Sequence, residues 1–288
     1  MSTLHTWQRY DIVLTAAIAC TNPYTDVIVW ADLTGPGFSR RVYGFWDGGL
    51  VFRVRVTATA PGTWTWVSGC EVQGIEGADP GLSGQTGSFE AAAWSEAEKL
   101  DNPCRRGFLR ASANGHAFQY EDGTPFLMLG DTWWATPTTR FPWREDDVPG
   151  DEIGDKGGQS SQGLFRPDQI GPDKLERSEV CHFQDMVRYR KAQGFNAIAM
   201  LAAHPAWAND SYPVTVVMND ADRTVIRNAW QQAGTDSAKN MANEGGRPFF
   251  FPGRVPGYED LVPDFDRINP EYFQAMDRKI YYLNDMGF

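Results

Sequence analysis

Residues 7–90 follow the two-residue period of β-strands. Within residues 51–57, apolar and polar side chains alternate strictly, as expected for a strand with one buried face. The same alternation recurs elsewhere in this region, at the apolar positions Tyr10, Ile12, Leu14, Val27, Val29, Ala31, Leu33, Trp64 and Trp66. Because glycine-rich turns separate these short strands, the pattern predicts an antiparallel, immunoglobulin-like β-sandwich over residues 1–95.

A linker and a hairpin follow the predicted sandwich. Residues 96–107 are largely polar, and we expect them to join two domains. Beyond them, Asn114-Gly115 separates residues 107–112 from residues 116–121. Asn-Gly between short apolar segments is a strong hairpin signal. The sequence therefore predicts an antiparallel strand pair directly after the linker.

From residue 125 the pattern changes to continuous apolar runs. Residues 125–130 and 195–203 are nearly free of polar side chains, as expected for strands buried on both faces. Between the two runs, Ser178 is a candidate N-cap for a helix, and Gly194 suits the position just past its end. The apolar face of this predicted helix consists of Val180, Phe183 and Val187.

A second helix is predicted near the end of the sequence. Asn269 and Pro270 suit its N-cap and first turn, and Gly287 suits its C-terminal end. Its apolar positions recur at three- and four-residue spacing and are Phe273, Met276, Ile280 and Leu283. Phe288 is expected to begin the next strand.

The order strand, helix, strand, helix predicts a parallel βα series. We therefore interpret residues 108–288 as the N-terminal part of a (β/α)8 TIM barrel, since a complete barrel takes about 250 residues. Residues 136–177 and 204–268 follow the two predicted strands. We expect them to be long loops at the carboxyl ends of the strands, where barrel enzymes place their chemistry.

Charge narrows the range of partners. The formal net charge is -11, and an acidic chain is a poor ligand for nucleic acids, which require a basic surface. No run of about 18 apolar residues predicts a membrane span, and the first residues lack the pattern of a secretory leader. We therefore expect a cytoplasmic protein that binds neither nucleic acid nor membrane. Its oligomeric state is left open.

The four cysteines lack the spacing of a zinc site. Cys20 and Cys70 both fall in the predicted sandwich, where a disulfide and two free thiols are the alternatives and free thiols are favoured. Acidic pairs such as Asp264/Asp266 are a weak calcium signal, and solvated loop charge is favoured instead. We expect no metal and no cofactor.

One pair in the predicted sandwich leaves two interpretations open. Trp46 and Asp47 form either a ligand-binding patch or a core tryptophan followed by a hairpin turn. The structural interpretation is favoured.

Polar and aromatic residues follow the two predicted barrel strands and form the predicted substrate-binding set. Asp131 is a candidate acceptor for sugar hydroxyls, and a carboxylate that caps local N–H groups is the alternative. Trp133 and Trp134 suit the C–H face of a sugar ring, although one of them is expected to be structural. His204 and Trp207 follow the second strand, where an imidazole either binds a substrate hydroxyl or has a structural role.

Several motifs occur in the order found in a known domain. They lie at residues 22–27, 44–49, 52–55, 61–64 and 84–89. Together they resemble a β-sandwich domain of formerly unknown function that precedes glycosidase-like barrels. Residues 118–125, 129–134 and 194–196 resemble the start of that barrel, which belongs to the apiosidase-like glycoside hydrolases. Residues 269–273 and 277–288 are similar to the second helix of the same family.

The resemblance implies a protein that hydrolyses glycosidic bonds with two carboxylates, one acid and one nucleophile or base. In that family both carboxylates lie on later barrel strands. The catalytic residues are therefore expected beyond Phe288, and whether this chain is itself an enzyme is left open. The alternative function is a non-catalytic carbohydrate-binding or docking module formed by the sandwich.

Overall fold

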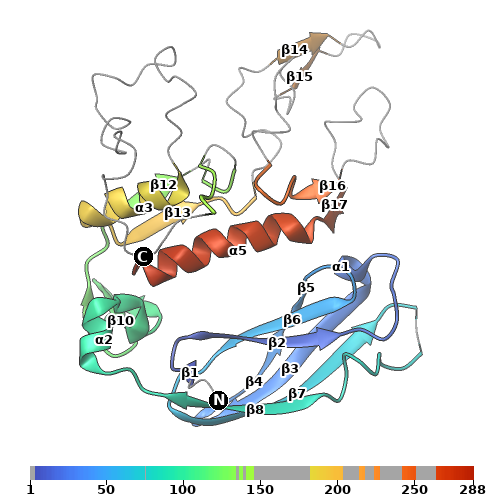
Figure 1. The fold of residues 1–288 in the computed structure, drawn as a ribbon, viewed down its shortest axis with the longest axis horizontal. Helices are drawn as coiled ribbons and strands as arrows, with labels where there is room; N and C mark the ends of the chain where they lie inside the picture. The colour runs from blue at the N-terminus through green and yellow to red at the C-terminus, as the bar shows by residue number, and fades with distance from the viewer. Residues whose placement is uncertain are drawn as a thin grey trace. The chain divides into compact units, whose positions relative to one another are not determined.

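A computed structural model describes the chain over residues 4–74, 76–133, 136–138, 141–145, 182–203, 214–217, 224–227, 242–250 and 264–288. The chain divides into two compact units, Met1–Met128 with Gly287 and Leu129–Met286 with Phe288 (Figure 1). The domain bounds expected from the sequence, 1–95 and 108–288, stay a prediction.

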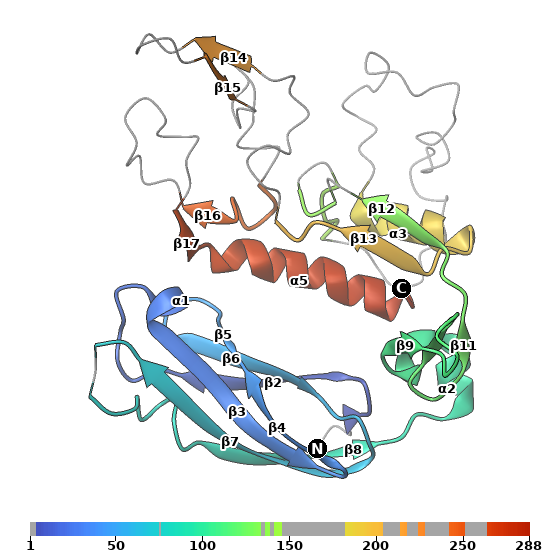
Figure 2. The same cartoon turned by 180° about the vertical axis from the view of Figure 1, so that it is seen from behind.

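Two β-sheets lie one over the other in the first unit (Figures 1 and 2). The larger sheet has the strand order β1-β8-β7-β3-β4 and the smaller one β2-β6-β5. The strands are β1 (Leu4–His5), β2 (Arg9–Thr15), β3 (Val27–Gly35), β4 (Phe38–Tyr43), β5 (Phe45–Trp46), β6 (Val51–Thr57), β7 (Gly62–Val72) and β8 (Thr86–Ala92), with a short helix α1 (Pro23–Asp26) before β3. Among them, β1 pairs with β8 in parallel, which the sequence did not predict, and the other pairings are antiparallel. The two-layer arrangement matches the predicted sandwich, and its immunoglobulin-like topology stays a prediction.

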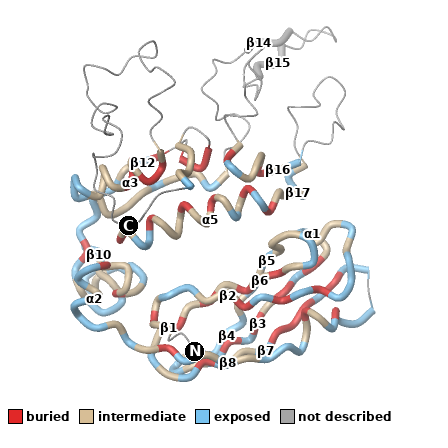
Figure 3. Tube along the Cα trace, viewed as in Figure 1, coloured by how far each residue is buried: buried red, intermediate tan, exposed pale blue. Residues whose placement is uncertain are grey.

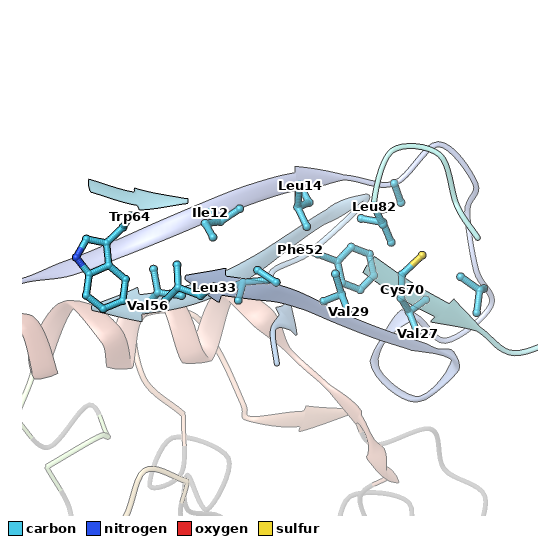
Figure 4. Packing of buried hydrophobic residues seen from close by; sticks show 14 of the residues in the cluster. Ile12, Leu14, Val27, Val29, Leu33, Phe52, Val56, Trp64, Cys70 and Leu82 are labelled. Carbon is cyan, nitrogen blue, oxygen red and sulfur yellow. The ribbon is translucent and has the colours of Figure 1, made fainter. Parts of the chain in front are cut away.

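Alternation along the strands builds the core between these sheets. In β6, the side chains of Phe52, Val54 and Val56 are at most 6% exposed, whereas Arg53 and Arg55 are partly exposed. The same core takes side chains from both sheets, including Ile12, Leu14, Val27, Val29, Ala31, Leu33 and Trp64 (Figures 3 and 4). Burying each large apolar side chain contributes roughly 1.5–3 kcal/mol. The predicted two-residue pattern is confirmed.

Two alternatives left open by the sequence now have answers. Cys20 and Cys70 are free thiols, so the disulfide alternative is wrong. Trp46 packs against the sandwich core and donates its indole N–H to the carbonyl oxygen of Gly49 at 2.9 Å. Asp47 pairs with Arg53. Both residues therefore have the favoured structural role.

A buried carboxylate joins the loop before β8 to the end of β2. Asp79 is 1% exposed, and its two oxygens accept backbone N–H groups from two segments of the chain. The donors are Ala17 at 3.0 Å, Ile18 at 2.8 Å, Gly81 at 2.7 Å and Leu82 at 3.2 Å. Burial raises the pKa of Asp79, but these hydrogen bonds outweigh it, and the net effect is a pKa below the usual value. The ionised form is therefore part of the folded sandwich.

Residues 96–107, expected to be a linker, contain the helices α2 (Glu96–Asp101) and η1 (Pro103–Arg106). Ser95 and Glu98 form a capping box at the start of α2. Arg106 is 9% exposed and donates to Asp122 at 2.8 Å and to Thr124 at 3.0 Å. These bonds attach the segment to the small sheet that follows it.

The small sheet contains β9 (Leu109–Ala111), β10 (Phe118–Tyr120) and β11 (Pro125–Phe126), in the order β11-β10-β9. β9 and β10 pair antiparallel, so the predicted hairpin is confirmed. At its entry, Gly107 has φ +99°, and a Cβ there would lie 2.7 Å from atoms of both Glu121 and Trp7. Glycine is therefore required at this position.

The apolar run at residues 125–130 is not one buried strand, which corrects the prediction. Its first two residues form β11, paired antiparallel with β10, and its last residue begins β12 (Gly130–Trp133). Leu127, between them, is 86% exposed. Apolar periodicity does not distinguish one buried strand from the end of one strand followed by the start of the next.

A parallel strand pair and two helices form the core of the second unit. β12 pairs in parallel with β13 (Ala197–Met200), and α3 (Phe183–Ala192) lies between them in the sequence. The buried residues of this core are Trp133, Phe183, Met186, Val187 and Leu283, the last from helix α5 (Pro270–Asp285) (Figure 3). The predicted order of strand, helix and strand is confirmed for β12, α3 and β13, whereas four further strands among the described residues precede α5 where the sequence predicted a loop.

The bounds of these elements differ from the prediction. α3 begins after His182 as N-cap, later than the predicted cap Ser178, which lies outside the described residues together with Val180. Gly194, with φ +89°, ends the helix as predicted. β13 covers only the middle of the predicted run 195–203, and its residues are partly exposed because its sheet has two strands in the described part of the chain.

α5 has the predicted caps but a different buried face. Asn269 accepts the N–H of Glu271 at 3.2 Å at the start of the helix. The residues buried along it are Pro270, Tyr272, Met276, Lys279 and Leu283. Phe273 and Ile280 were predicted on this face but are only half-buried. The prediction is confirmed for Met276 and Leu283, and it missed Lys279 because it admitted only apolar residues to the buried face.

Residues 204–268, predicted as a long loop, contain two antiparallel strand pairs. These are β14 (Val214–Val217) with β15 (Thr224–Arg227), and β16 (Phe249–Phe250) with β17 (Asp264–Ile268). The sheets of the described residues do not close into a barrel, and the partial barrel stays a prediction. None of the helices described is long and apolar enough to span a membrane.

Candidate functional site

Asp131 lies inside β12, one residue past its start, and not at the strand's end as predicted. One carboxylate oxygen accepts the N–H of Thr132 at 2.9 Å, and the other accepts the indole N–H of Trp133 at 3.0 Å. The second oxygen also lies 2.9 Å from Nε of Arg190, on α3. These contacts agree with the local-capping alternative and fix the orientation of the carboxylate. The side chain keeps 25% of its surface exposed, and its role in substrate binding stays a prediction.

Trp133 belongs to the core of the second unit. It is 5% exposed, and its ring meets Phe183 edge-on at a centroid distance of 6.4 Å. Its indole N–H is already donated to Asp131. Of the two adjacent tryptophans, Trp133 therefore has a structural role. Trp134 lies outside the described residues and stays the candidate for a sugar platform.

His204 and Trp207 also lie outside the described residues. β13 ends at Met200, and the described chain continues to Ala203. Their predicted position in one region with Asp131 stays a prediction.

The chain that leaves β12, here called the exit segment (residues 136–138 and 141–145), is anchored to α3. The N–H of Phe183 donates to the carbonyl oxygen of Pro142 at 3.0 Å. The fully buried side chain of Gln184 accepts the N–H of Arg144 at 3.1 Å and donates to its carbonyl oxygen at 2.9 Å. The amide of Gln184 therefore pairs with the exit segment as a neighbouring strand would.

Lys279 anchors the exit segment to α5. Its ammonium donates to the carbonyl oxygens of Phe141 at 3.0 Å, Thr136 at 3.4 Å and Thr138 at 3.5 Å, and lies 3.4 Å from a carboxylate oxygen of Glu244. The residue is 0% exposed. Burial lowers the pKa of Lys279, and Glu244 opposes this effect. A buried ammonium is tolerated only when it is paired and hydrogen-bonded, as it is here.

Glu244 holds a glycine turn against the same region. Its other carboxylate oxygen accepts the N–H of Trp143 at 2.6 Å. The turn is fixed to the start of α5 because Asn269 donates to the carbonyl oxygen of Gly245 at 2.8 Å. A Cβ on Gly245 would lie 2.0 Å from the carbonyl oxygen of Glu271, so only glycine fits. The exit segment, the turn and α5 thus form one hydrogen-bonded cluster.

The sequence analysis missed both charged residues of this cluster. Lys279 lies three residues after Met276 and four before Leu283, which is the spacing of a buried helix face. That spacing could have predicted the burial of Lys279. No pattern in the sequence marks Glu244, because it lies in a segment without periodicity. In the part of the chain that the structure describes, no group of three His, Cys, Asp or Glu side chains is arranged to hold a metal ion.

Comparison with known proteins supports the fold. The model of a family described as a domain of unknown function (DUF5060) matches residues 3–71, within the sandwich. A crystal structure named as a "putative glycoside hydrolase from Bacteroides vulgatus ATCC 8482" is similar to 100% of this chain, with a TM-score of 0.53 and 18% sequence identity. The chain spans 40% of the length of that protein. No curated protein matches the chain.

These findings show a fold like that of a protein named as a glycoside hydrolase, together with the DUF5060 match. Membership of the apiosidase-like family and the barrel architecture stay predictions.

Proposed function

We propose that the chain is the substrate-binding part of a glycoside hydrolase-like protein that acts on a poly- or oligosaccharide. The observation that carries the proposal is the fold similarity along the whole chain to a protein named as a glycoside hydrolase. The parallel order β12, α3, β13 agrees with the beginning of a (β/α)8 barrel. The apiosidase-like relationship and the partial barrel are part of the same proposal.

In this proposal the ends of the parallel strands bind the sugar. The carboxylate of Asp131 accepts hydrogen bonds from sugar hydroxyls on the lone pairs that its protein donors leave available. Arg190 fixes the orientation of this carboxylate. Trp134 stacks on the C–H face of a sugar ring, and His204 and Trp207 complete the rim. The cluster around Lys279 keeps the adjoining exit segment in a single conformation.

Hydrolysis requires a second set of groups. A glycosidase needs two carboxyl groups, about 5–5.5 Å apart for retention or about 6.5–9.5 Å apart for inversion. Asp131 and Glu244 are each held by protein donors, in positions that order the backbone. We therefore propose that Asp131 and Glu244 are not the catalytic pair.

The test combines hydrolysis and binding. We expect the purified chain to release no reducing sugar at an enzyme-like rate from a panel of polysaccharides and aryl glycosides. It should bind oligosaccharide fragments of one of them, and Asp131→Asn and Trp134→Ala should each weaken that binding at least fivefold. Asp101→Asn, at a carboxylate 76% exposed, is the matched control and should leave binding unchanged. Turnover near ~1 per second that Asp131→Asn abolishes would place a catalytic carboxylate within this chain.

A further inference from the structure

The outer face of the five-stranded sheet carries a patch of aromatic and charged side chains that neither core uses. Alternation along β3 turns Ile28, Trp30 and Asp32 away from the sandwich core. The register places Tyr43 of β4 opposite Trp30 and Arg41 opposite Asp32. These side chains therefore share one face of the sheet.

The patch exposes more apolar surface than single surface residues do. Tyr43 is 64% exposed and Ile28 is 49% exposed. Val67 of β7, opposite Asp32 on the other side of β3, is also 49% exposed. Contiguous apolar groups rimmed by polar ones are typical of a binding surface, whereas isolated exposed residues need no explanation.

Three side chains in the patch hold one another in place. Arg41 donates to both carboxylate oxygens of Asp32, at 2.8 and 3.0 Å, and its guanidinium lies 4.3 Å from the ring centre of Trp30. The hydrogen bond from Arg41 lowers the pKa of Asp32. Gly69 of β7 makes room for the indole, because a Cβ there would lie 2.5 Å from Cε2 of Trp30. The indole therefore extends across the neighbouring strand.

The chemistry of the patch selects the ligand. Aromatic rings suit the C–H faces of sugars, and a carboxylate–guanidinium pair offers acceptors and donors to neighbouring hydroxyls. The side chains of Arg41 and Asp32 remain 44% and 52% exposed, so their outer edges are accessible. Their charges cancel, and the chain as a whole carries -11, so an anionic polymer is disfavoured.

We propose that the face formed by Ile28, Trp30, Asp32, Arg41, Tyr43 and Val67 binds an uncharged polysaccharide. This site lies on the sandwich and goes beyond the function proposed for the second unit. Its ligand is recognised as a polyhydroxylated chain lying along the sheet, with no bond made or broken. Binding at this face does not require Asp131 or Trp134.

Affinity electrophoresis of the full chain tests the proposal. The gels contain neutral polysaccharides, namely xylan, arabinogalactan, xyloglucan and β-glucan, with polygalacturonate as the anionic probe. We expect retardation by at least one neutral polymer, weakened at least tenfold by Tyr43→Ala and by Trp30→Ala. Tyr24→Ala is the matched control, since this tyrosine is also exposed, at 45%, but lies on α1 outside the patch. Circular dichroism of each variant checks that the sandwich remains folded.

Each outcome either supports or overturns the proposed polysaccharide-binding face. Retardation that Tyr43→Ala abolishes and that Asp131→Asn leaves unchanged supports the patch, whatever happens to the proposed barrel site. Absence of retardation by all four neutral polymers, equal loss with Tyr24→Ala, or retardation by polygalacturonate alone overturns it. Hydroxyl-radical footprinting provides a second measurement. Protection of Tyr43 without polysaccharide would show that protein covers this face, from the second unit or another copy, and would also overturn the proposal.

Discussion

Replacing Asp79 should destabilise the sandwich more than replacing any exposed carboxylate. Its carboxylate accepts four backbone N–H groups, and each such bond contributes about 1 kcal/mol. Ala17 and Ile18 are exposed residues, so in Asp79→Ala we expect water to replace about half of the stability that their two hydrogen bonds contribute. Gly81 and Leu82 are more buried, so we expect the contribution of their hydrogen bonds to be lost in full. The expected loss is therefore about 3 kcal/mol.

Asp79→Asn isolates the contribution of the carboxylate from that of side-chain volume. The amide has the same shape but turns one acceptor oxygen into a donor, so about 2 kcal/mol should be lost. The assay is urea denaturation of the full chain with a short deuterium pulse, read by mass spectrometry on peptides of β2 and β7. Asp101→Asn is the control and should change stability by less than about 0.5 kcal/mol. If Asp79→Asn also stays within that limit, the hydrogen bonds do not carry the stability assigned to them.

The loss of stability in Asp79→Asn should depend on pH. The pKa of Asp79 is lower in the folded protein than the ordinary value of about 3.9 expected when unfolded. Its contribution is therefore fully present above about pH 4 and is lost as the pH falls through the folded pKa. The stability difference between the natural chain and Asp79→Asn should shrink below pH 4. If the stability difference between the two proteins stays constant from pH 7 to pH 2.5, the ionised carboxylate of Asp79 is not its cause.

Three further predictions concern other contacts. Lys279→Met should raise amide hydrogen exchange across residues 136–145, because three carbonyl oxygens and Glu244 lose their donor. Lys279→Arg should restore part of the protection. Equal exchange in the natural chain and in both variants would contradict this. Arg106→Met should cost about 2 kcal/mol in peptides of β9 and β10, measured by the same urea titration, because Asp122 and Thr124 each lose a donor while Asp122 keeps Lys99 at 3.8 Å; an unchanged midpoint would contradict this. Gly107→Ala should lower the melting temperature by several degrees in differential scanning calorimetry, since φ +99° and the clash with Trp7 both oppose a Cβ; an unchanged melting temperature would show that the chain relaxes freely there.

The sandwich was the part of the fold that the sequence predicted best. The strand β6 has one buried face, so Phe52, Val54 and Val56 carry the period directly in the residue types. The parallel strand β1 was missed because it has only two residues, too few to show a period. Periodicity thus predicts long half-buried strands and loses short edge strands.

The second unit was harder to predict because its signals are not periodic. The run at residues 125–130 spans two strands of different sheets, and nothing in its apolar residues marks the break at Leu127. The burial of Lys279 was missed because it depends on carbonyl groups more than 130 residues away in the sequence. Of the predicted site, Asp131 proved to be oriented by Trp133 of the same strand and by Arg190, which only the fold brings close to it.

The anchoring of the exit segment has a consequence for how this protein can change during evolution. The bonds of Pro142 to Phe183 and of Arg144 to Gln184 fix both ends of the span between residues 145 and 182. With its ends fixed, doubling the length of such a span costs only about 0.6 kcal/mol of closure entropy. Insertions and deletions there leave the supporting strands and helices in place. The length of the chain at this position can therefore change at little cost to folding.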